Sequence, residues 1–307
     1  MNTKLIKQKI KSVGNIKKIT RTMEMVSVAK MKRTTDAANA YRSFIANALG
    51  ILHNVHTDSY LRHPFIKKDI PSSLLHQGKV PQAEGVHDTK NILIIIGANK
   101  GLCGGYNTQL YKAVSKYFSD KNDNVSVIAI GKYGEKIAKK FTNDIFLSYI
   151  KNNISIRDAT IVTKEIIKRY MDKENPINTV TIINPHITTG VSYTIKTLQV
   201  LPFNINVDNL DKNSKDKSTE IKTTSLAYTY EPSPESVIES IIPLIIESIV
   251  LSSARETEAG EHTARMMAMK TATDNAGDLL DDLKLTYNNA RQAKITQEIA
   301  EISSAMV

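Results

Sequence analysis

Residues 266–290 have the sequence MMAMKTATDNAGDLLDDLKLTYNNA, which is the most regular stretch of the chain. Residues on one face recur in alternating steps of three and four: Met266, Met269, Thr273, Ala276, Leu280, Leu283, Tyr287 and Ala290. This spacing is an unbroken heptad repeat, the pattern that a left-handed coiled coil requires. The stretch therefore predicts a long helix that packs along one face against another helix.

The heptad repeat changes near the C-terminus. After Ala290 the pattern moves by five residues to Ile295 and continues at Ile299, Ile302 and Met306. A shift of register predicts that the helix changes its packing partner there.

The N-terminal end of the chain predicts a second long helix. Residues 1–63 contain no proline, and neither do residues 244–307, although the chain has nine prolines. About 55 helical residues would span roughly 80 Å. An apolar face that is not a strict heptad is expected at Ile6, Ile10, Val13, Ile16, Ile19, Met23 and Val26, and again at Tyr41, Ile45, Ala48, Leu52 and Val55.

The two ends of the chain have opposite charges. Residues 1–33 contain ten Lys or Arg residues and one acid, a net charge of +9, whereas residues 231–307 contain thirteen acids and six bases, a net charge of −7. Complementary charges steer and register a helix pair more than they stabilise it. We therefore expect the two ends to pair with each other.

The middle of the chain alternates between two kinds of pattern. Continuous apolar runs predict buried strands at 91–97, 125–131 and 179–184, helical patterns lie at 106–118, 133–141 and 158–171, and an alternating run at 193–204 predicts an edge strand. Strands that alternate with helices predict a small α/β domain with a parallel sheet. Ser233 is expected to cap the last helix.

Neither a catalytic site nor a metal or cofactor site is predicted. The loop GANKGLCGG at 97–105 follows a strand, but it lacks the spacing of a dinucleotide or Walker loop, so tight backbone packing is expected there. The seven histidines have no metal-ligand spacing. Cys103, the only cysteine, is expected to be a small buried residue. The apolar run at 241–251 is too short to span a bilayer.

Two other function classes stay open from the residues alone. The basic N-terminal helix could bind nucleic acid, in which case the protein is a coiled-coil binding or adaptor protein with an embedded α/β module. Against this, the helix lacks stacking aromatic residues. A nucleotide-dependent enzyme would bind ATP as an isolated chain, which the missing phosphate motif disfavours.

Five segments resemble the gamma-subunit family of F-type ATP synthases. They are IKSVGNIKKITRTMEMVSVAKM at 10–31, GLCGGYN at 101–107, YEP at 230–232, ARMMAMK at 264–270 and YNNARQAKITQE at 287–298. The segments occur in the family's order and cover both ends and the middle of the chain. The resemblance implies an antiparallel coiled coil of the terminal helices inside a ring of three alpha and three beta subunits.

The resemblance also implies a coupling role without catalysis or a bound cofactor. Nucleotides in this family react on the beta subunits, and the α/β domain lies at the foot of the shaft, beside the epsilon subunit and the membrane rotor ring. The chain is expected to link proton flow to ATP synthesis or hydrolysis. Its expected location is the cytoplasmic side of a bacterial inner membrane.

The matching motifs assign roles to individual residues. Met23 would face a moving loop of a beta subunit, and Arg265 would lie at a similar level. Polar contacts with beta-subunit loops are implied for Arg291, Gln292 and Thr296, and contacts with epsilon and the rotor ring for Tyr228, Tyr230 and Glu231. Gly260 departs from the family pattern, and a glycine inside a helix costs about 0.5–1 kcal/mol relative to alanine.

These observations together predict an α/β fold class. A long antiparallel coiled coil of the N- and C-terminal helices would hold an inserted, small Rossmann-like α/β domain. The expected boundaries are 1–57 for the first helix, 58–88 for a linker, 89–205 for the α/β domain, 206–232 for a polar linker and 233–307 for the last helix.

Overall fold

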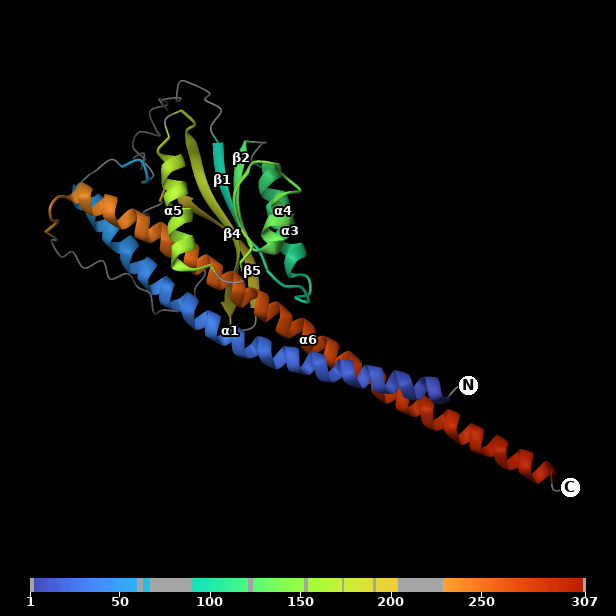
Figure 1. Ribbon diagram of the computed structural model, residues 1–307. Helices are drawn as coiled ribbons and strands as arrows, with labels where there is room; N and C mark the ends of the chain where they lie inside the picture. The colour runs from blue at the N-terminus through green and yellow to red at the C-terminus, as the bar shows by residue number, and fades with distance from the viewer. Residues whose placement is uncertain are drawn as a thin grey trace, which may run out of the picture. The chain divides into compact units, whose positions relative to one another are not determined.

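The computed structural model combines two very long terminal helices with a central sheet (Figure 1). It describes residues 3–59, 63–66, 90–120, 124–151, 154–172, 174–189, 192–203 and 229–305. In chain order, the elements are α1 (Thr3–Ser59), β1 (Lys90–Ile96), α3 (Tyr106–Asp120), β2 (Val125–Ile130), α4 (Lys132–Ala138), β3 (Ile145–Tyr149), α5 (Ile156–Tyr170), β4 (Ile177–Thr189), β5 (Ser192–Leu201) and α6 (Pro234–Ala305).

The chain divides into two compact units. The coiled-coil unit consists of Met1–Lys30, Leu102–Gly104 and His262–Val307, and the α/β unit consists of Met31–Gly101 and Gly105–Glu261. Both α1 and α6 contribute residues to both units.

The α/β unit is built on a five-stranded sheet in the order β3-β2-β1-β4-β5. β1 pairs in parallel with β2 and β4, and β2 pairs in parallel with β3. β5 runs antiparallel to β4 at one edge. The predicted parallel sheet and its alternating edge strand are confirmed, whereas β3 was not predicted from the sequence.

Both faces of the sheet are covered, which explains the continuous apolar runs. On one face, Ile92 and Ile94 of β1 belong to a core with residues from α1, α5 and α6, such as Leu52 and Ile246. On the other face, Leu93 and Ile95 pack in a separate core with Leu110 and Val114 of α3 and Ile137 of α4. The α/β unit therefore has the three-layer order of a doubly wound domain.

The helix α6 begins as the sequence predicts. Pro234 is its first residue, and the hydroxyl of Ser233 accepts a 3.3 Å hydrogen bond from the backbone N–H of Ser236. Among the described residues, α6 is the one helix long and apolar enough to cross a membrane, since an 18-residue window in it has a mean hydropathy of 1.8. Half of that window is buried in the fold, and the core helix of a soluble protein can pass the same test of length and composition. Residues such as Ile242, Ile245 and Ile246 explain its apolar composition.

The predicted heptad face of α6 is confirmed in the coiled-coil unit. Met269, Thr273 and Ala276 are buried there. The remaining positions of the face, from Met266 to Ala290, are partly buried. The hydroxyl of Thr273 donates a 2.8 Å hydrogen bond to the hydroxyl of Thr20 on α1. Lys17 lies beside Gly277, so residue numbers rise along α1 as they fall along α6, and the pair is antiparallel.

The predicted face of α1 is wrong at Ile16, Ile19 and Val26, whereas Met23 is partly buried. Ile16 and Ile19 are 49% and 59% exposed, and Val26 is exposed as well. Thr20 and Ser27 occupy the buried positions instead, at 8% and 2% exposure. Successive steps of three residues each fall about 60° short of a full turn, so a pattern with three such steps drifts to the opposite side of a helix.

The buried face of α1 instead follows a regular heptad. Its buried and partly buried members are Ile6, Ile10, Val13, Thr20, Glu24, Ser27, Met31, Thr34, Ala38, Tyr41, Ile45, Ala48, Leu52 and Val55. Hydroxyl side chains fit the buried face because each finds a partner: Ser27 donates to the Met23 carbonyl at 2.7 Å, and Thr20 donates to the Lys17 carbonyl at 3.1 Å.

The packing role that the sequence predicts for the glycine-rich loop after β1 is confirmed at its first residue, Gly97. A Cβ atom on Gly97 would lie 2.3 Å from the backbone nitrogen of Gly134. Gly131, with a φ of 84°, would place a Cβ 2.2 Å from the Gly97 carbonyl oxygen. Backbones of three segments therefore touch where no side chain can fit. Cys103 is buried, as expected.

Candidate functional site

Exposed apolar side chains are concentrated on the coiled-coil unit. On α1 they are Leu5, Ile16, Ile19, Met25, Val26 and Val28, on α6 they are Met267, Leu279, Leu285, Ile295, Ile299 and Ile302, and between the helices in sequence there is Leu102. We call these residues the exposed apolar residues. Clusters of exposed apolar side chains often mark an interaction site.

The last part of α6 is exposed on all sides. Every described residue from Arg291 to Ala305 is exposed, and Ala290 is the last partly buried member of the heptad face. The sequence predicted a change of partner in this region. Within the described residues, no part of α1 covers this segment.

Polar groups in the exposed segment interact mainly along their own helix. The hydroxyl of Thr296 donates to the Gln292 carbonyl at 3.0 Å, and Lys294 lies 3.1 Å from Glu298. Arg291 has no hydrogen-bond or ion-pair partner among the described residues. The predicted contact residues Arg291, Gln292 and Thr296 therefore lie on one short, exposed stretch.

Met23 and Arg265 differ in accessibility. Met23 is partly buried, whereas Arg265 is only 6% exposed and its Nη1 lies 3.2 Å from Nδ1 of His262. Their expected contacts with a beta subunit stay a prediction.

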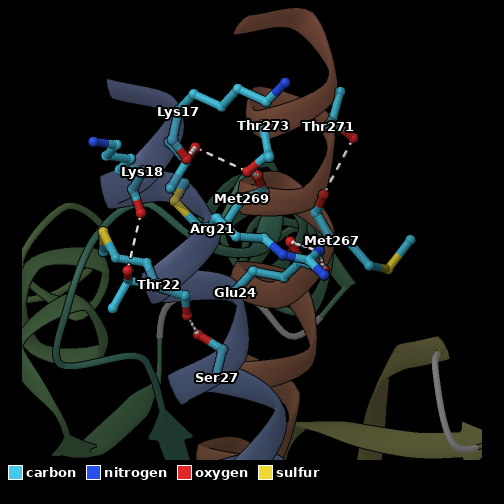
Figure 2. Close-up of polar contacts among 12 residues, drawn as sticks. Lys17, Lys18, Arg21, Thr22, Glu24, Ser27, Met267, Met269, Thr271 and Thr273 are labelled. Carbon is cyan, nitrogen blue, oxygen red and sulfur yellow. Dashed lines mark hydrogen bonds and ion pairs between the residues drawn. The ribbon is translucent and has the colours of Figure 1, made fainter. Parts of the chain in front are cut away.

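Charged residues near the helix–helix contact are neutralised locally (Figure 2). Arg21 forms a 2.9 Å ion pair with Glu24 on the same helix. The hydrogen bond and charge of Lys284, together with the charge of Lys17, hold the pKa of Asp281 below its ordinary value. Figure 2 also shows the Thr271 hydroxyl bonded to the Met267 carbonyl, so α6 satisfies this polar side chain itself.

A shallow groove in the α/β unit contains two of the predicted foot residues. It is lined by Ile51, Asn54, Thr229, Tyr230, Glu231 and Val237, and a neighbouring hollow is lined by Glu231, Pro232, Ser236, Val237, Ser240, Ile241 and Leu244. We call both together the foot groove. Among the described residues that line it, Glu231 is the one with a charge. Tyr228 lies outside the described residues.

The C-terminal end of β1 is where a doubly wound domain would bind a phosphate. Here the backbone N–H of Asn99 donates a 3.0 Å hydrogen bond to the carboxylate of Glu261. The side-chain oxygen of Asn99 accepts a 3.1 Å hydrogen bond from the Lys132 N–H. The carboxylate of Glu261 therefore already accepts the backbone N–H of Asn99 that this loop could otherwise offer to a phosphate. The described residues also contain no group of three potential metal ligands.

Comparison with known proteins agrees with these features. The family model described as ATP synthase matches residues 2–307. A protein of Halothermothrix orenii called ATP synthase gamma chain is 33% identical over 302 residues, which cover 97% of this chain and 95% of the relative. The chain belongs to the ATP synthase gamma-chain family. A second gamma chain, from Leptospira biflexa, is 32% identical over 97% of this chain and 95% of its own length.

The fold of this chain also resembles chains in solved ATP synthase structures. A chain from the Euglena gracilis mitochondrial ATP synthase in rotational state 3 has a TM-score of 0.60 and 18% identity, covering 99% of this chain and 93% of its own. A chain from the central stalk and c-ring of the Tetrahymena thermophila mitochondrial ATP synthase has a TM-score of 0.56 and 22% identity, covering 83% of this chain and 99% of its own.

Sequence reasoning missed two structural features of this chain. Ile16, Ile19 and Val26 of α1 were placed on the buried face, although the heptad spacing through Thr20 and Ser27 would have revealed their exposed position. The cluster of Arg42, His186 and Glu256 in the α/β unit was also missed, because 144 and 70 residues separate His186 from its two partners.

Proposed function

We propose that the chain is the rotating shaft that couples proton flow through a membrane rotor to ATP synthesis or hydrolysis on beta subunits. The main support is the exposed segment of α6 from Arg291 to Ala305, which extends the helix beyond its heptad contact with α1. A helix that leaves its partner with its side chains exposed is suited to contact other subunits. Membership of the gamma-chain family makes the surrounding catalytic ring the natural partner.

Asymmetry of the coiled-coil unit would provide the coupling. The exposed apolar residues of α1 lie between Leu5 and Val28, whereas those of α6 are spread from Met267 to Ile302. A ring of three like catalytic sites would therefore meet a different surface at each site. Moving a two-state site from 1:99 to 99:1 takes about 5.5 kcal/mol of differential interaction. Rotation would move this preference from one site to the next.

Near the end of α6, polar side chains would form directional hydrogen bonds with beta-subunit loops. Arg291 has a guanidinium without a partner among the described residues, and such a group can form charge-assisted bonds with carboxylates on beta-subunit loops. Gln292 and Thr296 lie one and five residues further along the same helix. Met23 and Arg265 would contact a beta subunit at another level of the shaft.

The foot groove would bind the co-rotating parts of the machine. Its apolar lining favours apolar side chains of the epsilon subunit or the rotor ring, and the carboxylate of Glu231 would pair with a cation on the partner. Tyr230 lines the same groove. The chain itself would have no catalytic role and would be peripheral to the cytoplasmic side of a bacterial inner membrane.

A reconstituted alpha–beta ring tests the proposal. With this chain in place, the ring should hydrolyse ATP and turn a bead attached to the chain. Because Cys103 is buried, the bead is attached through Lys112→Cys on the exposed side of α3.

Truncations supply the decisive comparison in the same assay. Deletion of residues 291–307 removes the exposed segment and leaves the whole heptad face, so rotation and torque should fall. Deletion of residues 303–307 alone is the matched control and should have little effect. Undiminished torque after the longer deletion would contradict the proposal.

A further inference from the structure

Helix α5 covers one face of the sheet in the α/β unit (Figure 1). Its residues Ala159, Val162 and Ile166 are buried in the core on that face. The opposite side of the helix carries a row of exposed residues: Arg157, Ile161, Lys164, Lys168 and Met171. We call these five residues the α5 stripe.

The α5 stripe has the spacing of a coiled-coil contact. Its members follow one another in steps of four, three, four and three residues, so they stay within about 80° around a helix of 3.6 residues per turn. Met171 is the C-cap of α5 and has φ −89° and ψ −4°, so the stripe continues to the end of the helix. The stripe spans two heptads, or about 21 Å.

Two members of the stripe are apolar although they face solvent. Ile161 is 51% exposed and Met171 is 53% exposed. A single exposed apolar residue is ordinary on a protein surface. Here, however, the two side chains occupy core positions of the same heptad pattern, and Lys164 and Lys168 occupy the core positions between them. The stripe is therefore a mixed row of apolar and cationic contact positions.

The charges of the stripe are not neutralised by α5 itself. None of its three cations has an ion-pair partner among the described residues. Both acids of α5 are already paired elsewhere, since Asp158 lies 2.8 Å from Lys151 and Glu165 lies 2.8 Å from Arg169. The stripe thus presents three positive charges to an external anionic group.

The chemistry of the stripe fits an acidic helix better than a lipid surface. A helix that lies in a membrane interface needs a broad apolar face that enters the lipid. The apolar residues of the stripe are separated by two lysines, and three of its five positions are cationic. A second helix with carboxylates opposite the cations and apolar residues opposite Ile161 and Met171 would match every position.

We propose that the exposed face of α5 is a docking surface for an acidic amphipathic helix of a partner protein. Burial of Ile161 and Met171 stabilises the helix pair, and the ion pairs steer the partner and fix its register. A lysine at a core position specifies the register of a helix pair in the same way. This surface shares no residue with the exposed segment of α6 or the foot groove, so the proposal does not depend on the proposed role in rotation.

Fluorescence anisotropy of a labelled peptide with the full chain tests the proposal. The probe has three heptads, with leucine at the first and fourth positions of each and glutamate at the flanking positions. It should bind the wild-type chain, and a peptide of the same composition with its leucines spread around the helix should bind about tenfold more weakly. Equal binding of the two peptides, or no binding of the heptad peptide, would overturn the proposal.

Charge reversal locates the surface. Lys164→Glu/Lys168→Glu turns two attractions into repulsions, so binding of the acidic peptide should weaken about tenfold. The matched control is Lys112→Glu/Lys116→Glu, which reverses two exposed charges at the same spacing on α3 and should leave binding unchanged. Equal losses in the two variants would show that net charge alone matters, and the docking surface would be wrong.

An apolar variant keeps the proposal testable if the charge-reversed chain does not fold. Ile161→Ser should weaken binding about fivefold, because a half-exposed isoleucine is no longer available for burial. Ile156→Ser is the control on the same helix, since Ile156 is 62% exposed but lies outside the stripe, and it should bind as the wild type does. Equal effects of the two serine variants would contradict the proposed register.

Vesicles that contain phosphatidylglycerol distinguish a membrane from a protein partner. The two charge-reversed variants should bind these vesicles equally, because both lose the same charge and neither loses a membrane site. Weaker vesicle binding by Lys164→Glu/Lys168→Glu alone would assign the α5 stripe to lipid and overturn the proposal.

Discussion

The hydroxyl of Thr273 on α6 lies 2.8 Å from the hydroxyl of Thr20 on α1, and both side chains are buried. A polar pair thus occupies the centre of a helix–helix contact where leucine or isoleucine is the usual choice. The Thr20 hydroxyl donates to the Lys17 carbonyl at 3.1 Å, and the single proton of the Thr273 hydroxyl is shared between Thr20 and the Met269 carbonyl, each 2.8 Å away. The pair is therefore satisfied internally and is specific to one register of the two helices.

Removing one member of this pair should destabilise the chain. Thr273→Val keeps the shape and leaves the Thr20 hydroxyl with one partner fewer, so the free energy of unfolding should fall by about 1 kcal/mol. The double variant Thr20→Val/Thr273→Val removes both polar groups and should be less destabilised than the sum of the two single variants. Urea unfolding followed by circular dichroism measures all three. Simple additivity would show that the two hydroxyls do not interact.

Two glycines of α6 should respond differently to alanine. At Gly277 a Cβ would meet only the flexible end of Lys17, so Gly277→Ala should stabilise the chain by about 0.5–1 kcal/mol. At Gly260 a Cβ would lie 3.2 Å from Cβ of Pro185 and 3.4 Å from the ring of Tyr106. Gly260→Ala should therefore give no gain. Equal stabilisation by both variants in thermal unfolding would contradict this account.

Asp158 should make folding sensitive to acid. Hydrogen bonds from Lys151 and Ser155 lower the pKa of Asp158 to about 2, from an ordinary 3.8. Because the folded-state pKa is depressed, the contribution is complete above pH 4 and is lost as the pH falls from about 4 towards 2. Asp158→Asn should lower stability at neutral pH by about 1 kcal/mol, since it breaks the capping box of α5. The variant should also lose part of the pH dependence in this window.

Unfolding curves between pH 2 and 5 provide the measurement for Asp158. The control is Asp120→Asn, which changes an exposed carboxylate at the end of α3. That variant should keep the wild-type dependence on pH. An unchanged acid transition in Asp158→Asn would show that another group is responsible.

Arg291 should contribute to coupling without contributing to folding. The side chain is exposed and unpaired among the described residues, so Arg291→Ala should leave the unfolding temperature unchanged. In the reconstituted ring, ATP hydrolysis should fall about tenfold, as expected for the loss of a charge-assisted hydrogen bond. Arg291→Lys retains the charge but cannot form a bidentate hydrogen bond with a carboxylate, so it should have an intermediate effect. Steady-state ATPase assays check the prediction, and wild-type activity in Arg291→Ala would contradict it.

The sequence predicted α6 better than α1 for a physical reason. Along α6 the buried positions are mostly apolar or small, so the heptad repeat is visible in the residue types. Along α1 between Val13 and Met31, the heptad positions include Thr20, Glu24 and Ser27, while Ile16 and Ile19 are exposed. A search for apolar spacing along α1 therefore finds exposed isoleucines and misses the polar residues that face α6.

In the α/β unit, too, the sequence predicted some elements and missed others. Strands buried on both faces, such as β1, were evident as continuous apolar runs. The edge strand β3 is covered less completely and has only five residues, so its pattern did not stand out. The contact among Arg42, His186 and Glu256 forms only because the fold brings α1, β4 and α6 together. No local pattern indicates that contact, because each residue alone resembles a solvated polar side chain.

The contact of Gly97, Gly131 and Gly134 limits how this chain can evolve. A side chain at one position would collide with the backbone at another, so a second substitution cannot relieve the first. A library of random variants selected for folding should thus retain glycine at Gly97 and Gly131, while Ile16 and Ile19 vary widely. The same library selected for ATP-driven activity should restrict the two isoleucines as well. The difference between the two selections would map the surfaces needed for partners separately from the positions needed for folding.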